Sequence, residues 1–160
     1  MRPDERIQVA ILVVLAAYGV LVAAPVVLGD RVVEPFSELG LLGPEMKLGD
    51  YPSEVMVGEE FDLYLYLGNH MGELSYYRVY AKLGDSGMNV SDSVPYGGVV
   101  VEDYEYVLVD DANVTLPISL SLGEAGVNKR LVFELHRFDG DDFVYDGIWV
   151  QLWLNVTAPG

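Results

Sequence analysis

The side chains that could support catalysis are few. The chain contains two histidines, His70 in a predicted turn and His136 on a predicted strand, and it has no cysteine. A hydrolase needs a nucleophile, a base and a group that orients the base. His136 is out of phase with the apolar Phe133 and Leu135, so we expect its side chain to face solvent or a sheet edge. We therefore predict that the protein is not an enzyme and needs no cofactor.

An acidic run near the C-terminus is the one candidate metal site. Its carboxylates are spaced so that two or three of them could converge on a calcium ion. The run lacks the Asp-x-Asp-x-Asp-Gly pattern and the distal Glu of a dedicated calcium loop. We favour a solvated hairpin turn and keep calcium as the alternative, with ligands from Asp139, Asp141 and Asp142.

Three Asn-x-Ser/Thr sequons follow the predicted N-terminal segment, at Asn89, Asn113 and Asn155. This pattern is the acceptor for N-glycosylation and is typical of chains exposed outside the cytoplasm. The alternative is turn and strand chemistry that matches the pattern by coincidence. We predict glycosylation at the three asparagines.

Aromatic residues are concentrated in the predicted strands. Six of them fall on the phase opposite the apolar core positions, so they could line an outer face and form an aromatic patch that docks a protein or a glycan. The alternative is that both faces of these strands are partly buried. The six residues are Tyr64, Tyr66, Tyr76, Tyr80, Trp149 and Trp153.

The elements that carry these side chains are predicted to be strands. Apolar and polar residues alternate with period two from residue 61 to 67 and from 114 to 122, which is typical of half-buried strands. Gly- and Asp-rich turns separate seven or eight such segments, and Pro117 indicates an edge strand or a bulge. The fold class is therefore all-β, an immunoglobulin-like sandwich over residues 36–157. We assign 36–42 to its first strand and keep a partner-contacting segment over 36–44 as the alternative.

The N-terminal segment predicts a membrane anchor. Residues 7–28 contain no charge, and 22 residues form a helix of about 33 Å against a hydrocarbon core of about 30 Å. Arg2 and Arg6 precede it, so the positive-inside rule places residues 1–6 in the cytoplasm and residues 29–35 as a linker outside. A cleaved signal peptide is the alternative. A small-residue face for a neighbouring helix could be formed by Ala16, Gly19 and Ala23.

The motif Phe36-Ser37-Glu38-Leu39-Gly40-Leu41-Leu42-Gly43-Pro44 is followed by Gly49-Asp50-Tyr51-Pro52, Val57-Gly58-Glu59 and Gly68-Asn69-His70. Together these segments resemble an uncharacterised archaeal family of membrane proteins, and the similarity covers most of residues 36–156. The resemblance implies transmembrane helices joined to an outer domain, and no assigned reaction. Met71 departs from the acidic residue that the family pattern has after Asn-His, which weakens a polar role for that loop.

The charge balance excludes one class of partner. The chain has 25 acidic and 9 basic residues, and such a surface is a poor match for nucleic acid. We expect a single-pass protein of the cell membrane, with a cytoplasmic N-terminus and an extracellular domain. Its partners would be the lipid bilayer, an integral membrane protein and possible glycans.

These observations favour a non-catalytic accessory subunit of an archaeal membrane complex. Single-span subunits with an outer immunoglobulin-like domain are similar to accessory subunits of oligosaccharyltransferases, so glycosylation machinery is one expected host. The alternative is a freestanding cell-surface protein that binds glycans or envelope proteins.

Overall fold

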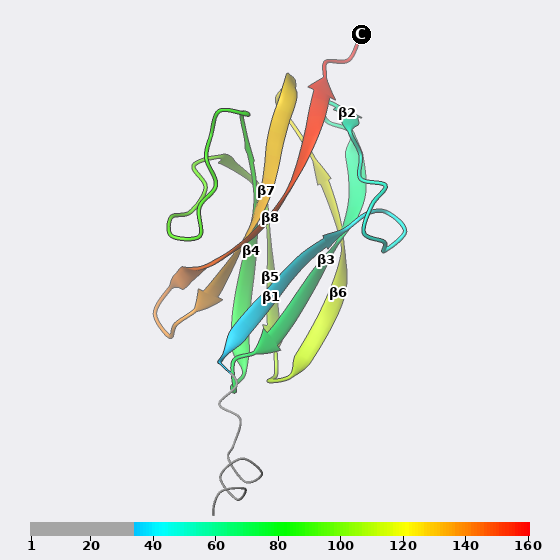
Figure 1. The fold of residues 1–160 in the computed structure, drawn as a ribbon. Coiled ribbons are helices and arrows are strands. Elements are labelled where there is room, and N and C mark those ends of the chain that lie inside the picture. The colour runs from blue at the N-terminus through cyan, green and yellow to red at the C-terminus, as the bar shows by residue number, and fades with distance from the viewer. Residues whose placement is uncertain (1–33) are drawn as a thin grey trace, which may run out of the picture. The chain divides into compact units, whose positions relative to one another are not determined.

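A computed structural model describes residues 34–160, and residues Pro35–Gly160 form one compact unit. Eight strands and no helix form in that range (Figure 1). The strands are β1 (Phe36–Leu42), β2 (Glu54–Met56), β3 (Glu60–His70), β4 (Ser75–Gly84), β5 (Val99–Leu108), β6 (Ala112–Ser121), β7 (Gly126–Phe138) and β8 (Phe143–Thr157).

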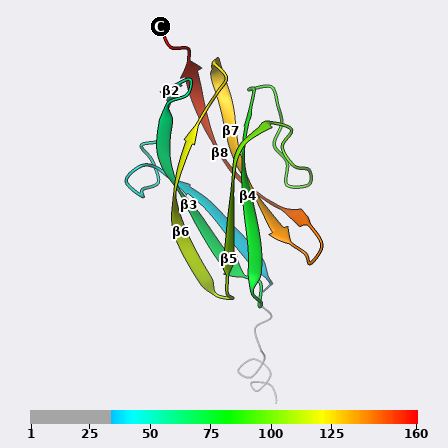
Figure 2. The same cartoon turned by 180° about the vertical axis from the view of Figure 1, so that it is seen from behind.

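The strands form two sheets that pack face to face. One sheet has the order β1-β3-β6, and the other has the order β2-β8-β7-β4-β5. All neighbours are antiparallel except β2 and β8, and the chain changes sheet at every connection except β4–β5 and β7–β8 (Figure 2). Two antiparallel sheets with such crossovers make an immunoglobulin-like sandwich, so the predicted all-β class is confirmed.

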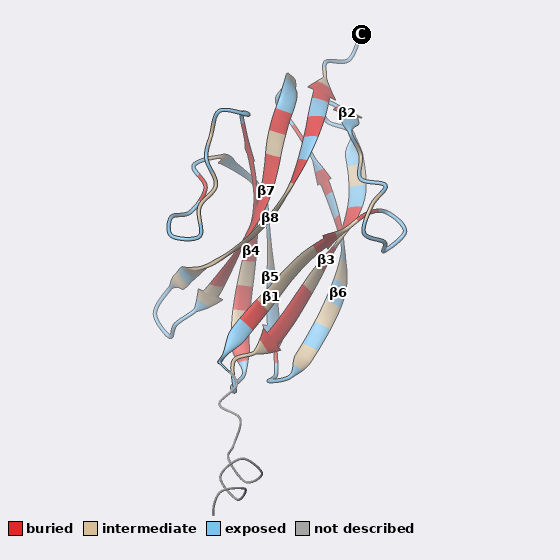
Figure 3. Cartoon of the chain, viewed as in Figure 1, coloured by how far each residue is buried: buried red, intermediate tan, exposed pale blue. Residues whose placement is uncertain are grey.

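The core consists of the apolar phases of both sheets. Leu63, Leu65 and Leu67 of β3 face Val79 of β4 and Phe133 of β7 across the interior, and all five are buried. Figure 3 shows the resulting alternation of buried and more exposed positions along the strands. Burying one such side chain contributes about 2 kcal/mol, so the core stabilises the domain although the chain has no cysteine.

Several local predictions can be compared with the strands. Phe36–Leu42 is a strand that pairs with β3, as favoured. Pro117 lies on β6, an edge of the three-stranded sheet, which confirms the edge assignment. The predicted turn at His70 is wrong, because Gly68 and Asn69 continue β3 and the chain turns only after His70.

No helix within residues 34–160 has the length and apolar character that a membrane span requires. The predicted anchor over residues 7–28, with Ala16, Gly19 and Ala23, lies outside the described residues.

Candidate functional site

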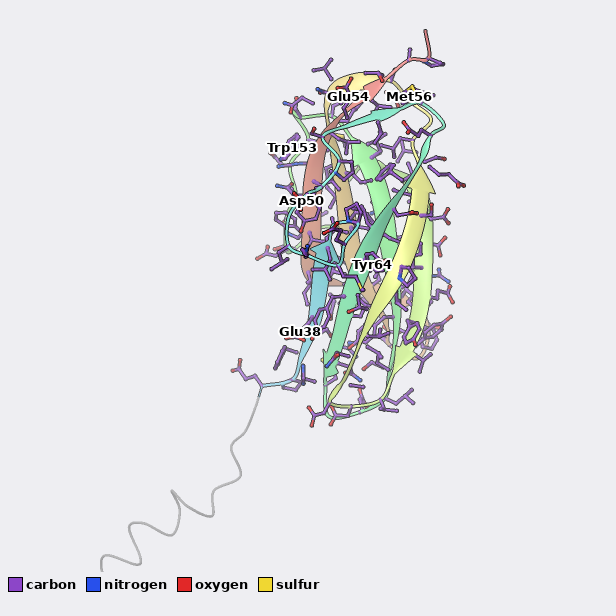
Figure 4. All side chains as sticks on the ribbon, turned by 90° about the vertical axis from the view of Figure 1, so that its right-hand side faces the viewer. Glu38, Asp50, Glu54, Met56, Tyr64 and Trp153 are labelled. Carbon is purple, nitrogen blue, oxygen red and sulfur yellow. The ribbon has the colours of Figure 1, made fainter. Side chains whose placement is uncertain are left out.

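The six aromatic residues of the predicted patch lie on two opposite faces. Tyr64 and Tyr66 of β3 project from the outer face of the three-stranded sheet. The other four belong to the five-stranded sheet, and Figure 4 shows Tyr64 and Trp153 well apart. The prediction that the six residues form a single aromatic patch is therefore wrong. Alternation along a strand identifies which side chains point outward, but it does not identify the sheet to which the strand belongs. The four residues of the five-stranded sheet are Tyr76 and Tyr80 of β4 and Trp149 and Trp153 of β8.

An aromatic cluster lies where the β7–β8 hairpin meets β4. The ring of Phe143 lies 4.8 Å from that of Tyr76 and 5.4 Å from that of Phe138, measured between centroids. The guanidinium of Arg78 lies 4.2 Å from the Phe143 ring centroid and pairs with Glu105. We call Tyr76, Arg78, Phe138 and Phe143 the hairpin cluster. The sequence analysis identified only Tyr76 of this cluster. Phe138 and Phe143 flank the Asp-rich turn in the sequence, and that position was a signal for both of them.

The hairpin cluster is at the same end of the sandwich as the start of β1. Phe36 pairs with His70 at the end of β3, and β4 begins five residues later at Ser75, next to Tyr76. We call this the β1 end, which is the lower part of Figure 1. It also presents the exposed side chains of Leu74 and Phe138.

Trp153 lies toward the opposite end of the same sheet. Its side chain is 38% exposed, and the Arg130 guanidinium lies 4.5 Å from its ring centroid. Arg130 also donates a 2.7 Å hydrogen bond to the Met88 carbonyl, which fixes the stacking geometry. Trp149 is only partly exposed and stands opposite Glu134 in the register of β7 and β8.

The loop of residues 85–98 covers part of the five-stranded sheet (Figure 1, green). Lys82 Nζ donates to the Tyr96 carbonyl at 3.0 Å, and the Tyr96 N–H donates to Glu134. The Tyr145 hydroxyl donates to the Ser91 carbonyl at 2.7 Å, and burial raises the pKa of Tyr145 to about 12. Side chains of the sheet therefore hold the loop through its backbone.

A buried charge cluster lies beneath this loop. Glu134 is 0% exposed, and its Oε2 lies 2.7 Å from Lys82 Nζ and 3.6 Å from His136 Nε2. Burial acts to raise the pKa of Glu134, but His136, Lys82 and the Tyr96 N–H outweigh it and hold the pKa below its usual value. The prediction that His136 faces solvent is wrong, because the rings of Tyr80 and Tyr145 pack against its ring, at 4.8 and 5.3 Å between centroids, and bury it.

A second polar group occupies the outer face of the three-stranded sheet at the β1 end. The Tyr66 hydroxyl donates to Glu38 at 2.8 Å, while His70 lies between Glu38, at 3.5 Å, and Asp111, at 3.0 Å. The hydrogen bond with Asp111 raises the pKa of His70, burial opposes this, and Glu38 adds to it. Gly68 makes the arrangement possible, because a Cβ there would collide with the Glu38 carboxylate.

Asn69 joins the strands of both sheets at the β1 end. Its side chain is fully buried, donates to the Glu73 and Leu108 carbonyls at 2.8 and 2.9 Å, and accepts from the Tyr77 hydroxyl at 3.1 Å. Tyr77 in turn contacts the Ser37 hydroxyl of β1 at 3.0 Å. In the Gly68-Asn69-His70 motif, Gly68 therefore lets Glu38 approach the backbone, Asn69 bonds inside the sandwich, and the half-buried His70 lies between two carboxylates. Nothing in the local sequence identified these partners.

The candidate calcium run forms the β7–β8 turn. The Asp139 carboxylate accepts the backbone N–H groups of Asp141 and Asp142, both at 3.0 Å, and these bonds lower its pKa. No group of three or more His, Cys, Asp or Glu side chains within residues 34–160 is arranged to hold a metal ion.

The three sequon asparagines are all exposed. Asn89 lies in the loop of residues 85–98, Asn113 on the outer phase of β6 and Asn155 near the end of β8. Asn155 Oδ1 accepts the Asn128 N–H at 2.8 Å. Each side chain is therefore placed where an attached glycan would extend into solvent.

A depression of about 290 Å³ lies beside Tyr64 on the three-stranded sheet. Its lining includes the ring of Tyr64 together with Asp62, Ser119, Pro44 and Pro117. One aromatic ring beside a carboxylate and a hydroxyl is a lining that suits a sugar ring.

The comparisons with known proteins give a family and a set of similar folds. The sequence profile of a family described as "Domain of unknown function (DUF1616)" matches residues 31–142. No protein with a curated description matches the chain.

Solved structures resemble the chain at low sequence identity. A CARDB domain from Pyrococcus furiosus, solved in complex with di-metal ions, is 12% identical with a TM-score of 0.48, and the match covers 81% of this chain and 96% of that one. A β-glucosidase from Listeria innocua is 12% identical with a TM-score of 0.49, covering 77% of this chain and 16% of the enzyme. The sporulation control protein Spo0M from Bacillus subtilis is 10% identical with a TM-score of 0.47, covering 77% and 50%.

Proposed function

This chain belongs to the DUF1616 family, and on that premise we propose that it is a non-catalytic accessory subunit of an archaeal membrane protein complex. The apolar segment 7–28 holds it in the bilayer, and the sandwich docks on the extracytoplasmic surface of an integral membrane partner. Glycosylation machinery is one host with these requirements.

The observation that carries the proposal is the hairpin cluster at the β1 end. Aromatic side chains and Arg dominate the binding energy of protein interfaces, and here Arg78 is already fixed against Phe143 and Glu105. A side chain ordered before binding loses less entropy when the partner arrives. The cluster therefore has the composition and the rigidity of an interface centre.

The position of the cluster supports a partner in the membrane. Residues 29–35 link the apolar segment to Phe36, and seven residues span at most about 24 Å. A linker of that length would let the outer loops of an integral membrane protein reach the β1 end.

The charges around the cluster favour a protein over the lipid surface. Asp139, Asp141 and Asp142 follow Phe138 directly, and Asp111 lies at the same end beside His70. Anionic headgroups would be repelled by these carboxylates, whereas basic outer loops would be attracted.

The state of the histidines supports a role without catalysis. His70 is held between two carboxylates, and His136 is buried against the rings of Tyr80 and Tyr145. Neither histidine has a serine or threonine hydroxyl among its hydrogen-bond partners, so no Ser-His or Thr-His pair forms among the described residues.

The depression beside Tyr64 favours a second candidate, a freestanding surface protein that binds glycans. Its lining offers one ring for stacking and the polar groups of Asp62 and Ser119 for sugar hydroxyls. Replacing Tyr64 by Ala would then weaken glycan binding and leave any membrane partner attached.

The test is extraction of the full-length chain from native membranes in a mild detergent, followed by mass spectrometry of what co-purifies. We expect a stoichiometric integral membrane partner, and its loss in the Phe138→Ala, Phe143→Ala double variant. Trp153→Ala removes an exposed aromatic residue far from the β1 end and should keep the partner. Recovery of the wild-type chain alone would refute the proposal.

A further inference from the structure

β5 is an open edge of the five-stranded sheet. It pairs with β4 alone, and the register is unbroken from Glu102 opposite Ala81 to Leu108 opposite Ser75. In an antiparallel edge strand, alternate residues direct their N–H and C=O groups away from the sheet. The segment Glu102–Leu108 therefore presents a row of backbone groups with no partner strand.

The other sheet edges carry features that hinder strand addition. β2 has only three residues and covers β8 only from Asn155 to Thr157, and the rest of that edge is interrupted at Gly147, which has a φ of 76° beside a register shift against β7. β6 contains Pro117, which lacks an N–H. β1 contains Gly40, which weakens a strand, and it packs beside β8. β5 contains neither proline nor glycine, and its only irregularity lies before Glu102. Glu102–Leu108 is thus the edge segment best suited to receive another strand.

The side chains of this segment define what it can receive. Val107 is 50% exposed and Tyr106 is also exposed, which gives an added strand apolar surface to cover. Glu102, Asp103 and Glu105 are acidic, and no Lys or Arg occurs in the sequence between Lys82 and Lys129. Arg78 of β4 is the one base paired with Asp103 and Glu105 among the described residues, so acidic charge remains in excess.

We propose that β5 binds an extended segment of a partner protein by strand addition, and that this segment alternates Lys or Arg with apolar residues. Backbone hydrogen bonds supply affinity in this mode, and the alternate side chains supply specificity. Basic residues opposite Asp103 and Glu105, which share one face of β5, make favourable cross-strand pairs. A second copy of this chain fits poorly, because an antiparallel pair centred on Glu105 would oppose acid to acid. The inference does not depend on the membrane anchor.

The experiment uses the full-length chain and a capped seven-residue peptide that alternates Lys and Val. We expect the peptide to bind to the chain. Binding should slow hydrogen exchange at alternate amides of Glu102–Leu108 by roughly tenfold or more. The same peptide with N-methyl groups along one edge keeps its charge but cannot donate from that edge, and we expect binding to fall about tenfold. Charge reversal by Glu102→Lys with Asp103→Lys should weaken binding of the unmodified peptide.

The matched control is Glu60→Lys with Asp62→Lys on β3, which changes the net charge equally and should leave binding intact. Three results would overturn the inference. The unmodified peptide could fail to bind at low salt, or it could bind without protecting the β5 amides, which is electrostatic attraction only. Protection of those amides in a peptide-free dimer would instead assign the edge to a second copy of the chain.

Discussion

Replacing Glu134 by Gln tests whether the buried charges hold the loop of residues 85–98. The carboxylate lies 2.7 Å from Lys82 Nζ and accepts the Tyr96 N–H from the loop. Gln keeps the shape of the side chain and one oxygen for Tyr96. It leaves the nearly buried charge of Lys82 without an anion.

The size of the effect follows from that lost partner. Removing one member of a buried ion pair costs about 3–5 kcal/mol. Lys82 Nζ keeps its 3.0 Å bond to the Tyr96 carbonyl, so we expect the low end, about 3 kcal/mol. For a domain of this size that loss lowers the Tm by roughly 10 °C. The Lys82→Met, Glu134→Gln double variant has no uncompensated charge and should recover most of the loss.

The same pair makes the stability depend on pH in a defined direction. The pKa of Glu134 in the folded chain is lower than the unfolded value of 4.5, despite the opposing effect of burial. The stabilisation is therefore complete above about pH 4.5 and is lost as the pH falls through the folded pKa. In Glu134→Gln this acid-dependent component should be absent.

Urea unfolding of the full-length chain measures the loss in the free energy of unfolding. Hydrogen exchange of residues 85–98 measures the loss of protection in the loop. Glu60→Gln, at an exposed position of β3, is the control and should change the free energy of unfolding by less than about 0.5 kcal/mol. If Glu134→Gln also stays within about 0.5 kcal/mol and the loop amides keep their protection, the buried pair does not hold the loop.

Three further predictions concern the β1 end and the sequons. Asn69→Ala removes the hydrogen bonds that join β3 to the Glu73 carbonyl and to β4 and β5 of the opposite sheet, and it should lower the free energy of unfolding by about 3–5 kcal/mol, measured by urea titration. NMR titration should give His70 a pKa above its ordinary 6.5, and Asp111→Asn should bring it down. Because that pKa is raised, the contribution of His70 to stability is complete below pH 6.5 and is lost as the pH rises through the folded value. In the native host, the intact mass should exceed 17.6 kDa by attached glycan, and Asn113→Gln should remove one increment if that site is used.

Local patterns predicted the fold because they report on burial. The alternation of Leu63, Leu65 and Leu67 with polar neighbours required one buried face, and that face became the core. Pro117 could be assigned to an edge because a missing N–H is tolerated where no second strand pairs. Both arguments need only neighbouring residues, so both could be made from the sequence.

The polar groups could not be predicted because they depend on pairings between distant segments. Glu38 reaches His70 only because β1 pairs with β3 in a register that sets Glu38 opposite Gly68. Glu134 has the outward phase of its strand, yet it is buried because the loop of residues 85–98 reaches it through the Tyr96 N–H. Phase along one strand says nothing about a loop that returns over that strand from elsewhere in the chain.

The Lys and Arg side chains of the domain are all paired within the domain, and this determines which partners the domain attracts. The first 33 residues contain equal numbers of acidic and basic residues, so the net charge of −16 falls entirely on residues 34–160. Each of the six bases in that range already has a partner: Lys47 with Glu45, Arg78 with Glu105, Lys82 with Glu134, Lys129 with Asp85 and Glu124, Arg130 with Trp153 and Met88, and Arg137 with Asp146.

Consequently no unpaired base remains within residues 34–160 to balance the acids in excess at the β1 end and along β5. A partner at either place must supply positive charge, and part of its attraction will be long-range and screened by salt. The aromatic residues of the hairpin cluster and the backbone of β5 act only at contact. Raising the ionic strength should therefore slow association at both surfaces more than it speeds dissociation, because the contacts that keep the complex together are mainly uncharged.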